Sequence, residues 1–420
     1  MKTFEPRGRA LALTAVLALC APAPGRAGEL PTGPIVAADG HVTIAGDVAA
    51  TISCAHSDLP NAPLCSGDTG FFNYTDYEHS ALRLFRVDVT AAVKATDRFS
   101  LLAELRTENA DTPQPYGLYV RIKPWTTHDF DIQAGRIPTV FGAFSRRTYP
   151  SDNILIGYPL AYQYLTSLRA DALPASADDL LRMRGRGWLA SYPIGNPLAD
   201  RGVPLVSAFR WDTGAQVHAA NRFMEGAVSV TVGTLSNPLV SDDNGGRQIS
   251  GRAAVHPTAG LVIGFSGARG PFVTQAAADA AGVGTTSGQF TQTAWGADIE
   301  YSHAYYLVRA EALVSDWRVP VVNAPFVTNP LRAASGYIEG RYKFGPRFYV
   351  AGRLDRLGFS EVTGTGRTQS WDAPVTRTEV GGGFALQRNL DLKMSLQHDS
   401  RSGGRVTAAS MLATQLVFWF

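Results

Sequence analysis

Three arginines stand at alternate positions in the segment RMRGRGW, namely Arg182, Arg184 and Arg186. If this segment is extended, alternate side chains share one face, and three guanidinium groups lie side by side. A guanidinium keeps its charge and forms paired hydrogen bonds with carboxylates and phosphates. The pattern therefore predicts either a patch that attracts anions or ion pairing with the nearby Asp178 and Asp179.

Two cysteines offer a second kind of chemistry. Cys54 and Cys65 enclose the stretch AHSDLPNAPL, which is rich in turn-forming residues. An exported chain meets an oxidising compartment, in which disulfides persist. A disulfide between these cysteines would contribute about 3 kcal/mol in the chain-entropy model. We predict this disulfide, with two free thiols or a metal pair that includes His56 as the alternatives.

Signals for catalysis and metal binding are weak. Nucleophilic catalysis needs a nucleophile, a base and an orienting acid at one place, whereas the chain has no Gly-x-Ser-x-Gly segment and its eight histidines are scattered. Asp242, Asp243 and Asn244 form an acidic turn, but the ligand spacing of a dedicated calcium loop is missing. We therefore predict no catalytic residue, no metal site and no cofactor.

The chain begins with an export signal, by the usual pattern of such segments. Three cations precede residue 10, an apolar run covers 10–20, and small residues lead to Ala27. This arrangement predicts a cleaved signal peptide over 1–27, followed by a short lead over 28–40. The predicted mature chain is close to neutral, because residues 1–27 hold four of the 38 basic residues and one of the 36 acidic residues. No nucleic-acid binding is expected from such a balance.

A period of two residues recurs from His41 to the end of the chain. In FRVDVTAAVK (85–94), apolar side chains alternate with Arg86, Asp88, Thr90 and Lys94. The same alternation appears in YGLYVRIK, WGADIEY, YLVRAEALV and GYIEGRYKF. Alternation of this kind predicts β-strands with one apolar face and one polar face.

The connections between these strands alternate in length. Seven short turns and eight longer loops join the predicted strands, which gives sixteen strands over 41–420. A soluble sandwich also alternates, but it has no such rule of short and long connections. Lipid cannot hydrogen-bond to the main chain, so a sheet in lipid must close on itself. The pattern therefore predicts an all-β, transmembrane, antiparallel up-and-down β-barrel.

The chain ends on an aromatic segment, ATQLVFWF. Leu416, Phe418 and Phe420 alternate with Gln415, Val417 and Trp419. This pattern predicts a final strand that closes onto the first, with aromatic side chains at the membrane boundary. A C-terminal phenylalanine on such a strand resembles the assembly signal of bacterial outer-membrane barrels.

The whole predicted mature chain resembles a sixteen-stranded bacterial outer-membrane porin. The stretch AGRIPTVFGAFSRR, with Gly135, Arg136, Ile137, Phe141 and Gly142, resembles a motif of phosphate-selective porin-like proteins. The lysine cluster of those proteins is not matched, because the chain has only five lysines. The resemblance implies passive diffusion, often as a homotrimer, with the barrel-assembly machinery and outer-membrane lipid as partners.

The longest predicted loop, 137–204, follows the fifth strand and resembles the inward-folded constriction loop of porins. Loops of this length are usually functional. Its arginines either form an anion-attracting constriction or bind the phosphates of lipopolysaccharide at the cell surface. The candidate constriction residues are Arg136, Arg146, Arg147, Arg169, Arg182, Arg184 and Arg186.

The polar faces of the strands carry nearly equal numbers of the two charges. Selectivity in a barrel depends on pore width and rings of charge, so we expect weak anion preference and passage of small polar or anionic solutes. A surface adhesin or structural barrel is the first alternative function, and a barrel enzyme is a less favoured one. The predicted lumen-wall residues are Arg106, Arg121, Lys123, Arg309, Glu311, Glu339, Arg341, Arg353 and Asp355.

Overall fold

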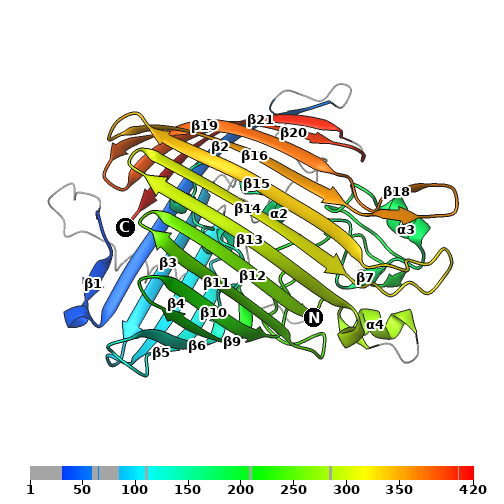
Figure 1. The fold of residues 1–420 in the computed structure, drawn as a ribbon, viewed down its shortest axis with the longest axis horizontal. Helices are drawn as coiled ribbons and strands as arrows, with labels where there is room; N and C mark the ends of the chain where they lie inside the picture. Colours follow the sequence, from blue (N-terminus) through cyan, green and yellow to red (C-terminus); the bar gives the residue numbers. More distant parts are fainter. Residues whose placement is uncertain are drawn as a thin grey trace, which may run out of the picture.

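Sixteen long antiparallel strands form a closed barrel in the computed structural model, which describes residues 31–58, 65, 85–108, 112–207, 211–282, 286–404 and 406–420 (Figure 1). The all-β barrel predicted from the sequence is confirmed. The predicted signal peptide lies outside the described residues. The strands are β2 (Val42–Ser57), β3 (Phe85–Lys94), β4 (Phe99–Glu108), β5 (Gln114–Ile122), β6 (Asp129–Ile137), β9 (Asp212–Ala220), β10 (Met224–Thr231), β11 (Gln248–Thr258), β12 (Leu261–Pro271), β13 (Thr291–His303), β14 (Tyr306–Trp317), β15 (Leu331–Lys343), β16 (Phe348–Phe359), β19 (Val375–Gln387), β20 (Leu390–Arg401) and β21 (Ala408–Trp419).

The ring closes where the last strand meets the first. β21 pairs with β2 in an antiparallel register that runs from Asp47 opposite Trp419 to Ser57 opposite Ala409. Phe420 continues this pairing through main-chain hydrogen bonds of 3.0 Å with Gly46. The short strand β1 (Ile35–Ala37) pairs with the start of β2. The predicted closure by the C-terminal strand is confirmed, and it leaves this seam without an open edge.

Inward and outward positions alternate along each strand. In β16, Arg353 and Asp355 are each 2% exposed, whereas Leu354 between them is 58% exposed. Exposed aromatic side chains, such as Phe223, Tyr306 and Phe348, lie beside the short turns. An apolar outer band with an aromatic girdle is the pattern of barrels that stand in lipid.

Short turns and long loops alternate as predicted except at β5, where the connection 109–113 before the strand is no longer than the turn 123–128 after it; the long loops lie on the right of Figure 1. Small elements occur near the loop side and at the N-terminus. None of the helices in the described ranges is long and apolar enough to cross a membrane. These elements are η2 (Ala38–Gly40), η4 (Phe144–Arg146), η5 (Pro150–Asp152), α2 (Leu160–Gln163), β7 (Ala172–Leu173), α3 (Ala177–Arg182), β8 (Ile194–Gly195), α4 (Gln275–Ala281), η6 (Ser287–Gln289), β17 (Glu361–Thr363) and β18 (Thr368–Ser370).

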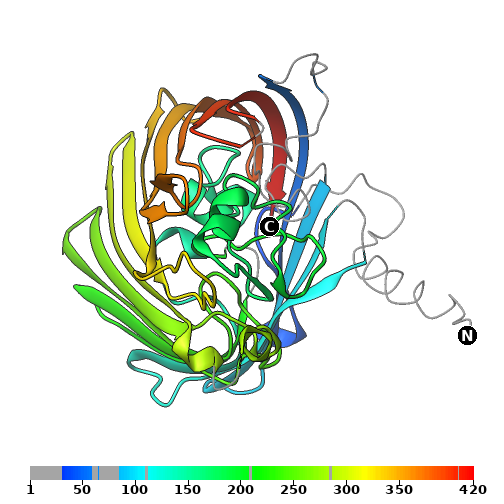
Figure 2. The same cartoon turned by 90° about the vertical axis from the view of Figure 1, so that its right-hand side faces the viewer.

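The connection between β6 and β9 folds into the barrel, and Figure 2 shows its chain inside the ring of strands. We call residues 138–207 of this connection the internal loop. The connection runs over 138–211 and thus extends beyond the predicted end at residue 204. Leu205 and Val206 pack in the buried core of the loop instead of starting a strand. The lumen therefore contains an apolar core, which includes Phe144, Tyr162 and Leu180.

Candidate channel and its internal loop

Two glycines of the porin-like motif have left-handed backbones where the chain leaves β6 for the lumen. Gly135 has a φ of +133° and Gly142 a φ of +66°. A Cβ atom at Gly142 would lie 2.3 Å from Glu311 Oε1 and 2.2 Å from the Tyr162 hydroxyl. A glycine is needed at this position because the left-handed backbone and the close approach both exclude a side chain.

Carboxylates of the inner wall hold the internal loop by its main chain. They accept hydrogen bonds from loop N–H groups that would otherwise be buried without a partner. An N–H···carboxylate hydrogen bond is stronger than one between neutral groups. The donor and acceptor pairs are Ala143 with Glu311 (3.0 Å), Gly157 with Glu379 (2.9 Å) and Leu160 with Asp355.

Cations of the inner wall bind the carbonyl oxygens of the same loop. Lys393, which is 2% exposed, donates from Nζ to the Pro150 carbonyl at 2.6 Å. Arg377 donates to the Tyr158 carbonyl at 2.9 Å, and Arg353 donates to the carbonyl of Gly157. Wall groups of both signs thus fix the position of the loop main chain.

A chain of ion pairs links neighbouring strands beneath the loop. It starts at Arg147 of the loop, which pairs with Glu300, and continues across β14, β15, β16 and β19. Alternating charges satisfy each other here, which a buried charge requires. The successive pairs are Glu300 with Arg309 (3.0 Å), Arg309 with Glu339 (3.5 Å), Glu339 with Arg353 (3.3 Å) and Arg353 with Glu379 (2.5 Å).

Some charged side chains at the opposite arc of the wall, over β5 to β11, are accessible to water. The Arg146 side chain is 41% exposed and lies 3.9 Å from Glu225, which is 28% exposed. Arg121 on β5 is 33% exposed and pairs with Asp131 at 2.7 Å. Solvent therefore reaches Arg146, Glu225 and Arg121, whereas the wall carboxylates that bind the loop are almost fully buried.

The predicted constriction arginines do not form one group. Arg146 and Arg147 lie in the lumen beside the wall residues described above. Arg169 is buried within the loop, where it pairs with Asp171 at 2.8 Å and donates to the Ala190 carbonyl at 3.0 Å. Arg136 shares its sheet face with the exposed Leu118 and donates to the Pro115 carbonyl at 2.7 Å.

The extended conformation considered for RMRGRGW is wrong. Arg182 is the last residue of α3, and the next residues form turns. Arg182 lies 3.6 Å from Asp179, whereas Arg184 donates to the Ser370 carbonyl at 3.1 Å. Arg186 is exposed. The three guanidinium groups therefore do not share one face.

The predicted wall residues project from the inner face of their strands, except Lys123, which follows the end of β5. Arg106 pairs with Asp88 and lies 3.5 Å from the centre of the Tyr116 ring. Arg341 lies 5.8 Å from the centre of the Tyr349 ring, and Lys123 is half-buried. The other predicted wall residues, namely Arg121, Arg309, Glu311, Glu339, Arg353 and Asp355, form the ion pairs and loop contacts given above.

Asp372 is an anchor that the sequence pattern did not indicate. It is fully buried in the connection between β18 and β19, outside the strands. Its carboxylate accepts hydrogen bonds from the N–H groups of Ser167 (2.6 Å) and Gly185 (2.7 Å), which lie far apart in the internal loop. Burial raises the pKa of Asp372, and the hydrogen bonds from these N–H groups oppose that rise.

Substituting Asp372 by alanine should loosen the internal loop. The change leaves buried N–H groups of Ser167 and Gly185 without an acceptor, at a cost of about 1–3 kcal/mol for each group. We expect faster cleavage of the loop in limited proteolysis of the detergent-purified protein. Asp372→Asn keeps one acceptor oxygen and should lie between the wild type and Asp372→Ala. Equal cleavage rates for all three proteins would contradict this role.

Two clusters of acidic side chains are paired with arginines of the protein itself. Asp129, Asp131 and His218 lie close enough together to hold a metal ion, but Arg121 already pairs with Asp131. In the turn noted for calcium, Asp242 pairs with Arg247 and accepts a hydrogen bond from the Gly245 N–H at 2.9 Å. These arrangements stabilise a strand pair and a turn respectively.

The predicted disulfide is confirmed: Cys54, near the end of β2, is bonded to Cys65. Most of the connection from β2 to β3 lies outside the described residues.

Comparison with known proteins supports the architecture. No protein-family model and no curated protein matches the chain. Among solved structures, the outer-membrane expressed OmpT of Vibrio cholerae has a TM-score of 0.52 at 9% identity, over 92% of this chain and 100% of that chain. An anion-selective porin from Comamonas acidovorans has a TM-score of 0.52 at 11% identity, over 90% of this chain and 99% of that chain.

The chain has a porin fold. Salmonella typhi OmpF, solved in a complex with daunomycin, adds a TM-score of 0.51 at 9% identity, over 90% of this chain and 97% of that chain. The suspected resemblance to porins is thereby confirmed at the level of the fold. The phosphate-selective motif stays a prediction.

Proposed function

We propose that this protein is a bacterial outer-membrane porin through which small polar or anionic solutes diffuse passively. The observation that supports this most directly is a closed barrel with an apolar outer face and water-accessible charges on its inner arc from β5 to β11. A barrel of this strand number is wide enough to enclose an aqueous channel. Solutes then pass between the internal loop and that arc.

The charge along this passage supports a weak preference for anions. Arg146 is the most exposed cation of the ion pairs that line the arc, and its contact with Glu225 is long at 3.9 Å. Glu225 also pairs with Arg252 at 2.7 Å, and Arg252 pairs with Asp298 at 2.7 Å, so these four groups together carry no net charge. Arg146 is the most exposed of them, and its field is therefore the one best placed to act on a passing ion.

We propose the partners of an outer-membrane barrel for this protein. The aromatic C-terminal strand is suited to recognition by the barrel-assembly machinery, and the apolar outer face is suited to lipid and lipopolysaccharide. A homotrimer is the assembly that the resemblance implies. Cross-linking followed by mass measurement of the detergent-purified protein tests the trimer.

A transport role also accounts for the polar groups better than a catalytic role does. His398 and Ser410 form a hydrogen bond of 2.9 Å, which is the contact expected of a base and a nucleophile. Both residues project from the outer face of β20 and β21, where no carboxylate of these two strands accompanies them. Without an orienting acid, this pair lacks the third member of a catalytic triad.

Substituting Arg146 by glutamate should reverse the weak anion preference. The change alters the local charge by two, which at about 8 Å in water is worth about 1 kcal/mol. Chloride loses this energy and potassium gains it, so the permeability of chloride relative to potassium should change by about 2 kcal/mol and fall roughly thirtyfold. Reversal potentials of single channels in a salt gradient measure this ratio.

Arg182→Glu is the matched control, because Arg182 is an exposed arginine of the same loop that pairs within α3. It should leave the reversal potential unchanged. Clear cation selectivity of the wild type, or equal effects of the two variants, would contradict the proposed passage.

A further inference from the structure

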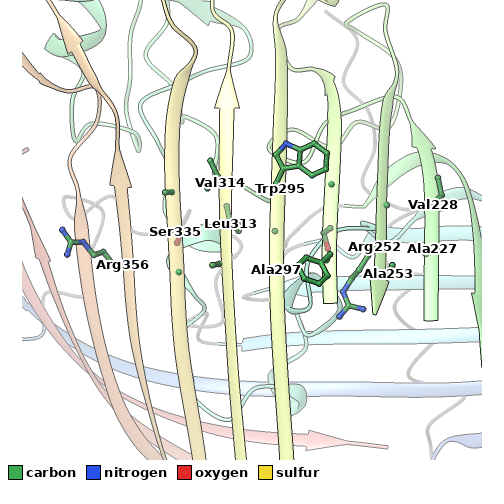
Figure 3. A pocket seen from close by; sticks show the side chains of 18 of the residues that line it. Ala227, Val228, Arg252, Ala253, Trp295, Ala297, Leu313, Val314, Ser335 and Arg356 are labelled. Atoms are coloured by element: carbon green, nitrogen blue, oxygen red, sulfur yellow. The ribbon is translucent and has the colours of Figure 1, made fainter. Parts of the chain in front are cut away.

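The outer face of the barrel has a hollow of about 1050 Å³ over β10 to β16, which Figure 3 shows from close by. The hollow exists because small residues form its floor while larger side chains, such as Trp295 and Phe265, form its rim. A second hollow of about 700 Å³ adjoins it. The two hollows share Ala297, Ala312, Gly336 and Arg356.

Arg356 is an unpaired cation in this apolar surface. Its neighbours Asp355 and Leu357 on β16 are buried inward, so Arg356 projects outward, where it is exposed. Its cross-strand partners are Gly336 and Thr376. Among the described residues it has no hydrogen-bond or ion-pair partner. A charge on the lipid-facing side of a barrel is costly unless it meets water or an opposite charge.

Arg356 lies on the side of the barrel that carries the long loops. It stands three residues before the end of β16, whereas Phe348 at the other end belongs to the aromatic side. Arg269 and Arg332 also project outward near the loop ends of β12 and β15. The outward cations Arg269, Arg332 and Arg356 thus all lie towards the long loops.

The charge of the outer wall favours a lipid over a second copy of the chain as the occupant. Among the outward positions of the described strands, Asp316 is the single carboxylate, and it already pairs with Arg332 at 2.8 Å. A second copy would therefore bring no free carboxylate from its strands to Arg356. A phosphorylated lipid brings both the phosphate and the acyl chains that fit a hollow floored by glycine and alanine.

We propose that Arg356 and the two adjoining hollows form a binding site for the lipid A part of lipopolysaccharide. This inference rests on the proposed outer-membrane location, since the long loops then face outside and lipid A forms the outer leaflet. The Arg356 guanidinium binds a lipid A phosphate through charge-assisted hydrogen bonds. The acyl chains fill the hollows beside Trp295 and over Gly336.

Binding of purified lipid A to the full chain in detergent micelles tests this site. Native mass spectrometry measures the affinity for lipid A and for its enzymatically dephosphorylated form. Loss of the guanidinium in Arg356→Ala should weaken lipid A binding roughly tenfold, as expected for a charge-assisted contact. Arg388→Ala, which changes an exposed arginine of the turn between β19 and β20, should bind as the wild type does.

A second pair of variants tests the hollows without changing charge. Gly336→Leu places a side chain on their floor, and its Cβ meets no atom closer than 3.7 Å, so the strand tolerates it. Gly340→Leu makes the same change on the same strand outside both hollows, with its nearest contact at 3.8 Å. We expect weaker lipid A binding for Gly336→Leu alone.

Three outcomes would overturn the site: unchanged affinity in Arg356→Ala, equal binding of dephosphorylated lipid A, or equal binding of phosphatidylglycerol. Single-channel conductance of the same variants is measured in parallel and should match the wild type. A wild-type protein that conducts normally but does not prefer lipid A to the other lipids refutes the site alone. Absence of conductance in every protein, including the wild type, refutes the proposed channel instead.

Discussion

Replacing residues 138–211 by a four-residue turn should raise the single-channel conductance roughly fivefold or more, because a sixteen-stranded barrel without internal chain leaves a wide aqueous channel. Ile137 and Asp212 are directly paired across β6 and β9, so a tight turn can join them without disturbing the barrel. The wall carboxylates released from the loop, such as Glu379 and Asp355, then meet water. Conductance in planar lipid bilayers measures the effect.

The connection between β10 and β11 provides a matched control for this replacement. Thr231 and Gln248 are also directly paired, so the same four-residue turn can replace residues 232–247. This second change should leave the conductance within about twofold of the wild type, because the internal loop still fills the lumen. Equal conductance of the wild type and the protein without residues 138–211 would show that the internal loop does not limit flow.

Substituting Arg353 by methionine should destabilise the barrel by about 3–5 kcal/mol, the usual cost of removing one partner of a buried ion pair. The Arg353 side chain is 1% exposed and lies between Glu339 at 3.3 Å and Glu379 at 2.5 Å. Its loss leaves two buried carboxylates near each other and removes a donor to the Gly157 carbonyl. Reversible unfolding in urea, with the protein in detergent micelles, measures the change in free energy.

Two further variants test whether the loss of stability comes from the broken ion pair. Arg353→Met combined with Glu379→Gln removes one of the unpaired charges and should recover part of the lost stability. Arg347→Ala removes an exposed arginine of the turn before β16 and should change the free energy of unfolding by less than about 0.5 kcal/mol. A similar loss in the single and the double variant would contradict the ion-pair account.

The barrel could be predicted from the sequence because lipid and water impose opposite demands on neighbouring residues. Leu354 and Asp355 are adjacent in the chain, and their types alone predicted that one faces out and the other faces in. The count of alternating short and long connections predicted the number of strands. Both signals are local, so they survive without knowledge of the tertiary structure.

The position of the internal loop could not be predicted in this way. Its contacts join main-chain groups of residues such as Gly157 to wall carboxylates more than two hundred residues away, and no local pattern encodes such a pairing. One error was avoidable, however. Ser176 caps α3 by accepting a hydrogen bond from the Asp179 N–H, and a serine with acidic residues two and three positions later is a helix-start signal. That signal opposes an extended conformation at Arg182.

The ion pairs beneath the internal loop are buried, whereas Arg146 is exposed. The two sides of the lumen therefore respond differently to ionic strength. Mobile ions screen interactions between exposed charges that lie more than about 10 Å apart at 0.1 M salt and more than about 3 Å apart at 1 M salt, but they act much less on buried pairs. At high salt concentration the passage therefore loses its charge selectivity. The width of the passage stays the same, because buried ion pairs set it. Filtering by charge and filtering by size are separable in this molecule.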